Sequence, residues 1–285
     1  NQAMYEGLMQ VKKEMGGAIQ VKVTEEVYNV ADTEPALRDF ASLGYDLVIG
    51  HGFQFQETMM KVAPQFPKVS FALASGFKLK PNVAIYDVNL QEGGYIMGVI
   101  AALLTKTKKV GIIGGVDVAE IHRGHSGFKL AVKSIDPSIQ VMELFTGDWR
   151  DAAKAKEGAI SMYESGADII WHSGDGIGLG VVEAAREKNK LVLGNVADQH
   201  KLAPNNVLSC VVYKWDAAIR NMIRDVKAGK FGNNKYWITF ANKGVGISPF
   251  RNLGDRIPAA AKAKIEETLK RLVEKKIEFP EEKKK

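Results

Sequence analysis

Hydrophobic and polar residues follow two different periods along the chain. Residues 1–15 carry an apolar side chain at every third or fourth position, which is the spacing of one helix face. Residues 45–50 (YDLVIG) are instead a short, nearly all-apolar run, typical of a strand that is covered on both sides of a sheet. Segments of the two kinds alternate over most of the sequence. This alternation predicts an α/β protein with parallel sheets and helices on both sheet faces.

The individual elements can be placed from the same pattern. Thr33, followed by Glu34 and Pro35, is expected to cap a helix over 33–43. The expected helices are 1–15, 33–43, 58–66, 92–105, 125–134, 152–165, 215–228 and 258–275. The expected strands are 19–30, 45–50, 68–74, 83–88, 109–114, 139–145, 190–196 and 207–212, with 236–240 and 244–248 as a strand pair or a strand and turn.

A repeated stretch predicts the domain organisation. GYDLVIGHG (44–52) aligns without a gap on GADIIWHSG (166–174). Each copy follows a helix and precedes a turn, a second helix and another apolar strand, which indicates an internal duplication. We therefore expect two doubly wound, Rossmann-like lobes joined by a hinge. Lobe one comprises residues 1–107 and 213–234, and lobe two comprises residues 108–212 and 235–285.

The duplication also predicts that lobe one lacks an element. Lobe two opens with the strand 109–114, whereas lobe one opens directly with the helix 1–15. The first strand of a doubly wound sheet normally lies in its interior, where its loss would leave a neighbouring strand unpaired. We expect the natural chain to carry roughly ten or more residues before Asn1, including a strand. A complete sheet without a gap in lobe one would refute the duplication.

Composition limits the classes of protein that fit this pattern. The 285 residues are 46% hydrophobic and 25% charged, which is typical of a folded globular chain. The net charge of +6 is not gathered into a Lys/Arg patch with interleaved aromatic residues, which argues against binding of nucleic acid. Cys210 is the single cysteine, so no internal disulfide can form. No apolar run has the length of a membrane span.

The chemistry is expected at the carboxyl ends of the strands, where parallel sheets bind ligands. The turns there are rich in Asp, Asn, His, Gly and aromatic residues, which suits a polar, planar and weakly charged small molecule. Trp149 lies among charged residues ahead of a helix and is a candidate for ring stacking. Phe53 is equally consistent with a lid over the ligand and with a core residue. Lys214 is equally consistent with a cation that reaches the cleft and with a surface lysine. His51 and His172 are expected to form hydrogen bonds behind the ligand.

Enzyme and metal motifs are incomplete. The tetrapeptide Gly124-His-Ser-Gly127 lacks the fifth-position glycine of a nucleophile elbow. The run GDGIGLG (174–180) matches neither common phosphate-binding glycine pattern, although it offers backbone N–H groups at the start of a helix. His122 and His125 have no third metal ligand nearby. The sequence therefore predicts no catalytic residue, no cofactor and no metal ion, with an enzyme as the minor alternative.

The chain resembles the basic membrane protein family of substrate-binding lipoproteins, which bind nucleosides for ATP-binding-cassette (ABC) importers. This resemblance implies the type I periplasmic-binding-protein fold, in which three crossovers join two lobes that close on a ligand like a hinge. The likeness covers nearly the whole chain, through Asn1-x4-Glu6-Gly7, YDLVIGHGFQF (45–55), VNLQEGGYIMG (88–98), GDWRDAAKAKEGA (147–159), GADIIWHSGDGIGLGVVEAA (166–185), GNVADQ (194–199), SCVVYKWDAAI (209–219) and NKGVGISP (242–249).

The resemblance also implies roles for individual residues. Trp149 corresponds to an aromatic residue that stacks on a purine base, Asp198 to a carboxylate that holds ribose hydroxyls, and Lys214 to a lysine near the sugar. Asp175 departs from the small-residue turn of many relatives, which leaves free base, nucleoside and another hydroxylated heterocycle open. The expected ligand-binding residues are Asn1, which opens the first helix beside the cleft, His51, Phe53, Gln91, Trp149, Gly174, Asp175, Asp198 and Lys214.

The function implied by the resemblance is that of a non-catalytic, extracytoplasmic binding protein, periplasmic or lipid-anchored. It would deliver a purine nucleoside or related base to an ABC permease in the membrane, and we expect it to be a monomer. Two other functions fit the same fold. An enzyme of hydrolase type acting on a nucleoside or sugar would consume its ligand. The sensor domain of a regulator would be fused to a DNA-binding or signalling segment.

Overall fold

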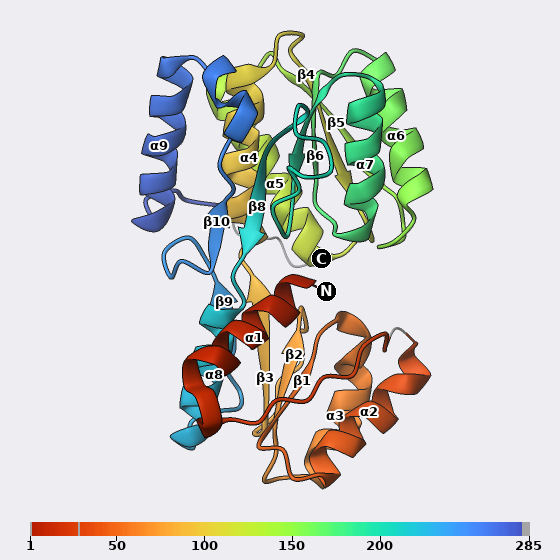
Figure 1. Cartoon of the computed structure of the whole chain (residues 1–285), viewed down its shortest axis with the longest axis vertical. Coiled ribbons are helices and arrows are strands. Elements are labelled where there is room, and N and C mark those ends of the chain that lie inside the picture. Colours follow the sequence, from red (N-terminus) through yellow and green to blue (C-terminus); the bar gives the residue numbers. More distant parts are fainter. Residues whose placement is uncertain (1, 28, 281–285) are drawn as a thin grey trace. The chain divides into compact units, whose positions relative to one another are not determined.

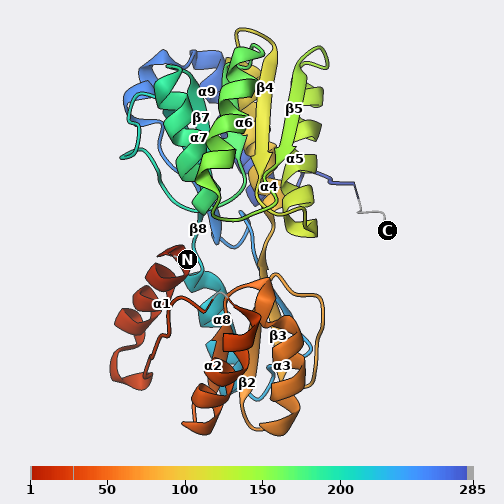
Figure 2. The ribbon, with the colours of Figure 1, turned by 90° about the vertical axis from the view of Figure 1, so that its right-hand side faces the viewer.

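The computed structural model describes residues 2–27 and 29–280. The chain forms two compact units (Figures 1 and 2). Unit 1 consists of Asn1–Val88 and Lys214–Ile238, and unit 2 of Asn89–Tyr213 and Thr239–Lys285. Each unit is a parallel or mainly parallel sheet with helices on both faces, as the alternation of strand-like and helix-like segments predicted.

Unit 1 contains a four-stranded parallel sheet in the order β1-β2-β3-β9. Helices α2 and α3 cover one face of this sheet, while α1 and α8 pack against each other on the opposite face (Figure 1). In this strand order, β1 is at an edge of the sheet. The elements are α1 (Gln2–Met15), α2 (Val30–Ser42), β1 (Leu47–Gly50), α3 (Gln56–Val62), β2 (Ser70–Ala74), β3 (Val83–Val88), α8 (Asp216–Lys227) and β9 (Lys235–Ile238).

Unit 2 contains a six-stranded sheet in the order β10-β8-β7-β6-β4-β5, in which β10 alone runs antiparallel. Helices α6 and α7 pack on one face, and α4 packs against α5 and α9 on the other (Figure 2). The elements are α4 (Leu90–Leu104), β4 (Lys109–Gly114), α5 (Ala119–Ile135), β5 (Gln140–Phe145), α6 (Ala152–Glu164), β6 (Ile169–His172), α7 (Gly176–Glu187), β7 (Leu191–Gly194), β8 (Val207–Tyr213), β10 (Val245–Ile247) and α9 (Ala259–Val273).

The boundary between the units differs from the expected one. Lobe one was expected to extend to residue 107, but α4 belongs to unit 2 because it packs closely on α5. A Cβ atom at Gly94 would lie 1.9 Å from the carbonyl oxygen of Gly124, so only glycine allows the two helix backbones to approach this closely. On the return path, β9 belongs to unit 1 because it pairs with β3. The segments 236–240 and 244–248 contain the strands β9 and β10 of two different sheets, and a backbone hydrogen bond from the N–H of Val245 to the carbonyl oxygen of Thr239 joins them.

The two units share local backbone features, which supports the internal duplication. Gly44 and Gly166 occupy equivalent turns, and both have positive φ angles, of 82° and 100°. Asn82 and Asn206 each precede the third strand of the repeat and fasten it to the preceding helix and strand. The side-chain Nδ2 of Asn82 donates to the carbonyl oxygens of Ala63, Phe66 and Val69, and that of Asn206 to those of Ala185 and Lys190.

Two local predictions in unit 1 are wrong. Residues 19–27 form neither helix nor strand with the described part of the chain, and Glu26 has a positive φ angle of 62°. Thr33 does not cap α2, which begins three residues earlier, at Val30. Its hydroxyl instead donates to the carbonyl oxygen of Val30 and lies 2.8 Å from that of Thr58, so it joins two helices. Among the described residues, no helix is long and apolar enough to cross a membrane.

Candidate ligand-binding site

Trp149 lies on a turn that its neighbours hold in place at the carboxyl end of β5. The side chain of Asp148 accepts hydrogen bonds from the backbone N–H groups of Arg150 (2.6 Å) and Asp151 (3.2 Å). Asp151 in turn caps α6, because its carboxylate accepts from the N–H of Lys154. Trp149 is 42% exposed. A large, partly exposed ring on a fixed turn is suited to stacking on a planar ligand.

Two neighbouring turns contact the Trp149 turn. A Cβ atom at Gly115, directly after β4, would lie 2.6 Å from Cε3 of the indole. The carbonyl oxygen of Trp149 accepts a hydrogen bond from the N–H of Ile177, in the first turn of α7. The Gly174–Asp175 turn, which follows β6, therefore lies beside Trp149, and Asp175 is exposed there. The ends of β4, β5 and β6 form a single edge, which we call the unit 2 edge.

Hydrogen bonds link two buried residues, Ser173 and His125, to the partly exposed Glu143 next to the unit 2 edge. His125 Nε2 lies 2.8 Å from Ser173 Oγ, and His125 Nδ1 lies 2.8 Å from Glu143 Oε1. Burial lowers the pKa of His125. The hydrogen bond from His125 lowers the pKa of the Glu143 carboxyl to about 2, because this bond and the nearby Lys129 outweigh the opposing effect of burial. The neutral imidazole thus donates to Glu143 and accepts from Ser173.

The connectivity of these hydrogen bonds is that of a serine–histidine–acid triad, which sequence reasoning did not find because the three residues are far apart along the chain. Ser173 is only 3% exposed and His125 only 1%, so a substrate has no access to the hydroxyl. The arrangement fixes the position of the turn after β6. Ser126, considered above for a nucleophile elbow, lies inside α5.

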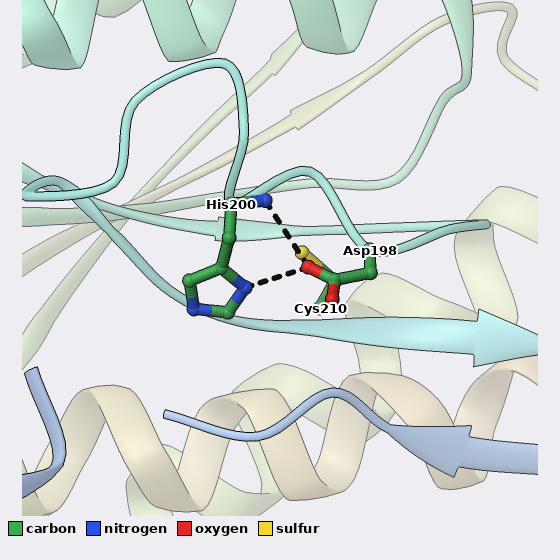
Figure 3. Close-up of side chains that lie close together, drawn as sticks. All are labelled: Asp198, His200 and Cys210. Atoms are coloured by element: carbon green, nitrogen blue, oxygen red, sulfur yellow. Dashed lines mark hydrogen bonds and ion pairs between the residues drawn. The ribbon is translucent and has the colours of Figure 1, made fainter. Parts of the chain in front are cut away.

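Asp198 lies on the turn after β7, and Figure 3 shows its contacts with His200. Its carboxylate accepts hydrogen bonds from the ring and the backbone of His200 and from the guanidinium of Arg251. Burial opposes ionisation, but these hydrogen bonds outweigh it and lower the pKa of Asp198 to about 2. Asp198 is therefore ionised at neutral pH, and its side chain is 31% exposed. It can still accept a hydrogen bond from a ligand hydroxyl.

Cys210 lies beside this pair, so three possible metal ligands come within 4.8 Å of one another (Figure 3). Their existing bonds do not favour a cation. The carboxylate of Asp198 already faces the positive charge of Arg251, and burial raises the pKa of the Cys210 thiol to about 11. A thiol must lose its proton to bind a metal. The arrangement is better described as a carboxylate whose charge is balanced by Arg251 than as a metal site.

In unit 1, His51 follows β1 and is fastened to the core. Its Nδ1 lies 2.8 Å from the hydroxyl of Tyr86, and its ring meets Trp215 edge-on. Burial lowers the pKa of His51 to about 4, so the ring is neutral at pH 7. In unit 2, His172 is fully buried between the carbonyl oxygen of Gly174 and the side chain of Gln199. Both histidines form hydrogen bonds inside their units, and their expected place behind a ligand stays a prediction.

Phe53 is exposed and forms no part of the core, which excludes one of its two expected roles. Its ring lies 6.1 Å from that of Phe77, which follows β2 and is 65% exposed. Sequence analysis did not select Phe77, although an aromatic residue directly after a Ser-Gly turn at a strand end was a usable signal. The two rings form an aromatic pair at the carboxyl edge of unit 1.

The other expected site residues are less informative. Lys214 is exposed at the first position of the segment that returns to unit 1. Gln91 is half-buried in the first turn of α4, in unit 2. Asn1 lies outside the described residues. The structure thus brings Trp149, Gly174 and Asp175 together, whereas the roles of all expected residues in binding stay predictions.

Comparison with known proteins identifies the family. The sequence model of the Bmp family, described as ABC transporter substrate-binding protein PnrA-like, matches residues 1–283. The chain belongs to this family. Two relatives of the Bmp protein have named ligands. A purine-binding protein of Brucella abortus is 29% identical over 88% of this chain and 73% of its own length. An ABC transporter nucleoside-binding protein of Lactococcus lactis is 31% identical over 78% and 68%.

Solved structures agree on the fold. An ABC transporter solute-binding protein from Conexibacter woesei superposes with a TM-score of 0.79 at 25% identity, over 98% of this chain and 93% of that one. The expected type I periplasmic-binding-protein fold is thereby confirmed. The Bmp protein is a substrate-binding protein of an ABC transporter, as the resemblance implied.

Proposed function

We propose that this Bmp protein captures a purine nucleoside or a purine base outside the cytoplasm and delivers it unchanged to the permease of an ABC importer. The observation that carries the proposal is the exposed ring of Trp149 on its fixed turn. An aromatic face recognises any planar ring, so it explains binding of a base without a charged partner. The named ligands of the two relatives belong to the same chemical class.

Carboxylates near the turns of unit 2 supply the polar part of the proposed recognition. Asp175 is exposed on the turn that lies next to the Trp149 turn, and Asp198 is ionised and partly exposed. Carboxylate oxygens accept from ribose hydroxyls and from the exocyclic amino groups of purines. Binding without chemistry is supported by the enclosed hydroxyl of Ser173, which a substrate does not reach.

The proposal can be tested with the purified chain. Mass spectrometry of the small molecules released on denaturation, followed by calorimetric titration with adenosine, guanosine, adenine and guanine, is expected to identify a purine ligand. After prolonged incubation, the nucleoside should be recovered intact. Release of free base or ribose would establish an enzyme instead. The absence of binding to all four compounds would refute the purine assignment.

A further inference from the structure

The turn after β7 contains a residue in an unfavourable backbone conformation. Val196 has a φ angle of 72°, in the left-handed region that favours glycine. A β-branched side chain is strained there, because Cβ and its two substituents crowd the backbone. The other non-glycine residues with positive φ in the described part of the chain are polar or charged. Val196 is also only 6% exposed, so the strained residue lies inside unit 2.

The neighbouring strand β8 holds this turn in place. The N–H of Tyr213, the last residue of β8, donates to the carbonyl oxygen of Val196 (3.0 Å), and its hydroxyl donates to Oδ1 of Asn195 (3.1 Å). At the other end of the turn, the N–H of Gln199 donates to Sγ of Cys210 (3.3 Å). Both ends of the turn are therefore fixed, which explains how a strained residue persists between them.

A second local cost lies in the same turn. The side-chain Nδ2 of Asn195 is buried and has no hydrogen-bond partner among the described residues. An unpaired buried donor reduces stability, as does a strained φ angle. Neither feature helps the turn to fold, so stability alone does not account for its conformation. The residue that this conformation presents is Asp198, whose partly exposed carboxylate lies two positions after Val196.

We propose that Val196 is a positioning residue, whose strained conformation holds the Asp198 carboxylate in the orientation that accepts a ligand hydroxyl. This inference rests on the proposed function and adds a residue that does not itself touch the ligand. With a side chain at residue 196, the fixed ends of the turn leave the backbone one narrow region of φ and ψ. Glycine has no Cβ and reaches many more conformations, so with glycine the carboxylate would no longer be preorganised.

Two substitutions of Val196 separate the strain from the loss of the side chain. Val196→Ala and Val196→Gly both remove the buried side chain, but only glycine adopts the left-handed region without strain. We expect the thermal midpoint of Val196→Gly to lie about 2–4 °C above that of Val196→Ala, although glycine is ordinarily the less stable of the two. Calorimetric titration with adenosine and with guanosine should give the reverse order, with a Kd about 5-fold higher in Val196→Gly than in Val196→Ala.

Asn189 supplies a matched control. It has a φ angle of 49° and lies in the turn before β7, at the opposite end of that strand from Val196. Asn189→Gly should likewise be more stable than Asn189→Ala. The two Asn189 variants should nevertheless bind the nucleosides equally well, because this turn carries no expected site residue.

A higher midpoint together with weaker binding in Val196→Gly, without such a difference in binding at Asn189, supports the proposal. If Val196→Ala is as stable as Val196→Gly, the φ angle stores no strain. If the two Val196 variants have equal Kd values, the strain does not position Asp198. Either result overturns the inference while purine binding by the original chain, and with it the proposed function, stands. Binding of neither nucleoside by the original chain would overturn the inference as well.

Discussion

Unit 1 and unit 2 repeat one order of helices and strands, but they differ beside the equivalent strands β1 and β6. Unit 2 has β4 between β5 and β6, whereas unit 1 has a cavity beside β1. The turns and side-chain clamps around this difference are nevertheless alike, down to the asparagines before the third strand. Local sequence therefore specifies these turns in both units, although different elements lie beside β1 and β6.

The turns at the carboxyl ends of the strands also differ between the two units. In unit 2, three adjacent strand ends bring Trp149 against Gly115 and beside the Gly174–Asp175 turn. In unit 1, the aromatic pair of Phe53 and Phe77 comes from turns after β1 and β2 alone. The comparison indicates that unit 2 presents the more complete binding surface of the two.

The asparagine clamps allow a direct comparison of stability between the units. Asn206→Ala should lower the free energy of unfolding by about 2–3 kcal/mol, because the carbonyl oxygens of the buried Ala185 and the half-buried Lys190 lose their donor. Asn82→Ala breaks three hydrogen bonds but lies at a half-buried site, where water can replace the lost donor, so about 1–2 kcal/mol is expected. Urea unfolding of each variant measures the loss.

The neighbouring exposed residue provides the control for this pair. Asn205→Ala should leave the free energy of unfolding within about 0.5 kcal/mol of the original value, since surface positions rarely contribute more. If Asn206→Ala were as neutral as Asn205→Ala, the clamp would not stabilise the repeat.

A smaller effect is expected from pH in unit 1. The pKa of His51 is about 4 in the folded chain, below the roughly 6.5 of an unfolded histidine, so protonation favours unfolding. Its contribution is complete above pH 6.5 and is lost as the pH falls towards 4. His51→Gln should therefore reduce the loss of unfolding free energy between pH 7 and pH 5, as measured by urea titrations at both pH values.

Acid sensitivity has further sources in unit 2, where burial also lowers the pKa values of His125 and His172. His51→Gln should accordingly flatten the pH dependence only in part. An identical pH dependence in the His51 variant and the original chain would contradict the assignment.

The sequence was sufficient to predict the fold class, the duplication and the turn that carries Trp149, because each rests on a local pattern or a repeated one. The unit boundary was not predictable in this way. Glycines at 93, 94 and 98 indicated that α4 packs closely, but not that its partner is α5. The Ser173–His125–Glu143 chain joins residues from three elements, so no spacing in the sequence revealed it. Phe53 was ambiguous because its exposure depends on how α3 packs.

The most direct test of the proposed function is calorimetric titration of the Trp149→Ala variant with the purine that the original chain binds. Loss of the stacking face should weaken binding by about 1–3 kcal/mol, which is a roughly 5- to 150-fold higher Kd. Leu179→Ala, at an exposed position on α7, should bind like the original chain. An unchanged affinity in the Trp149 variant would contradict the account.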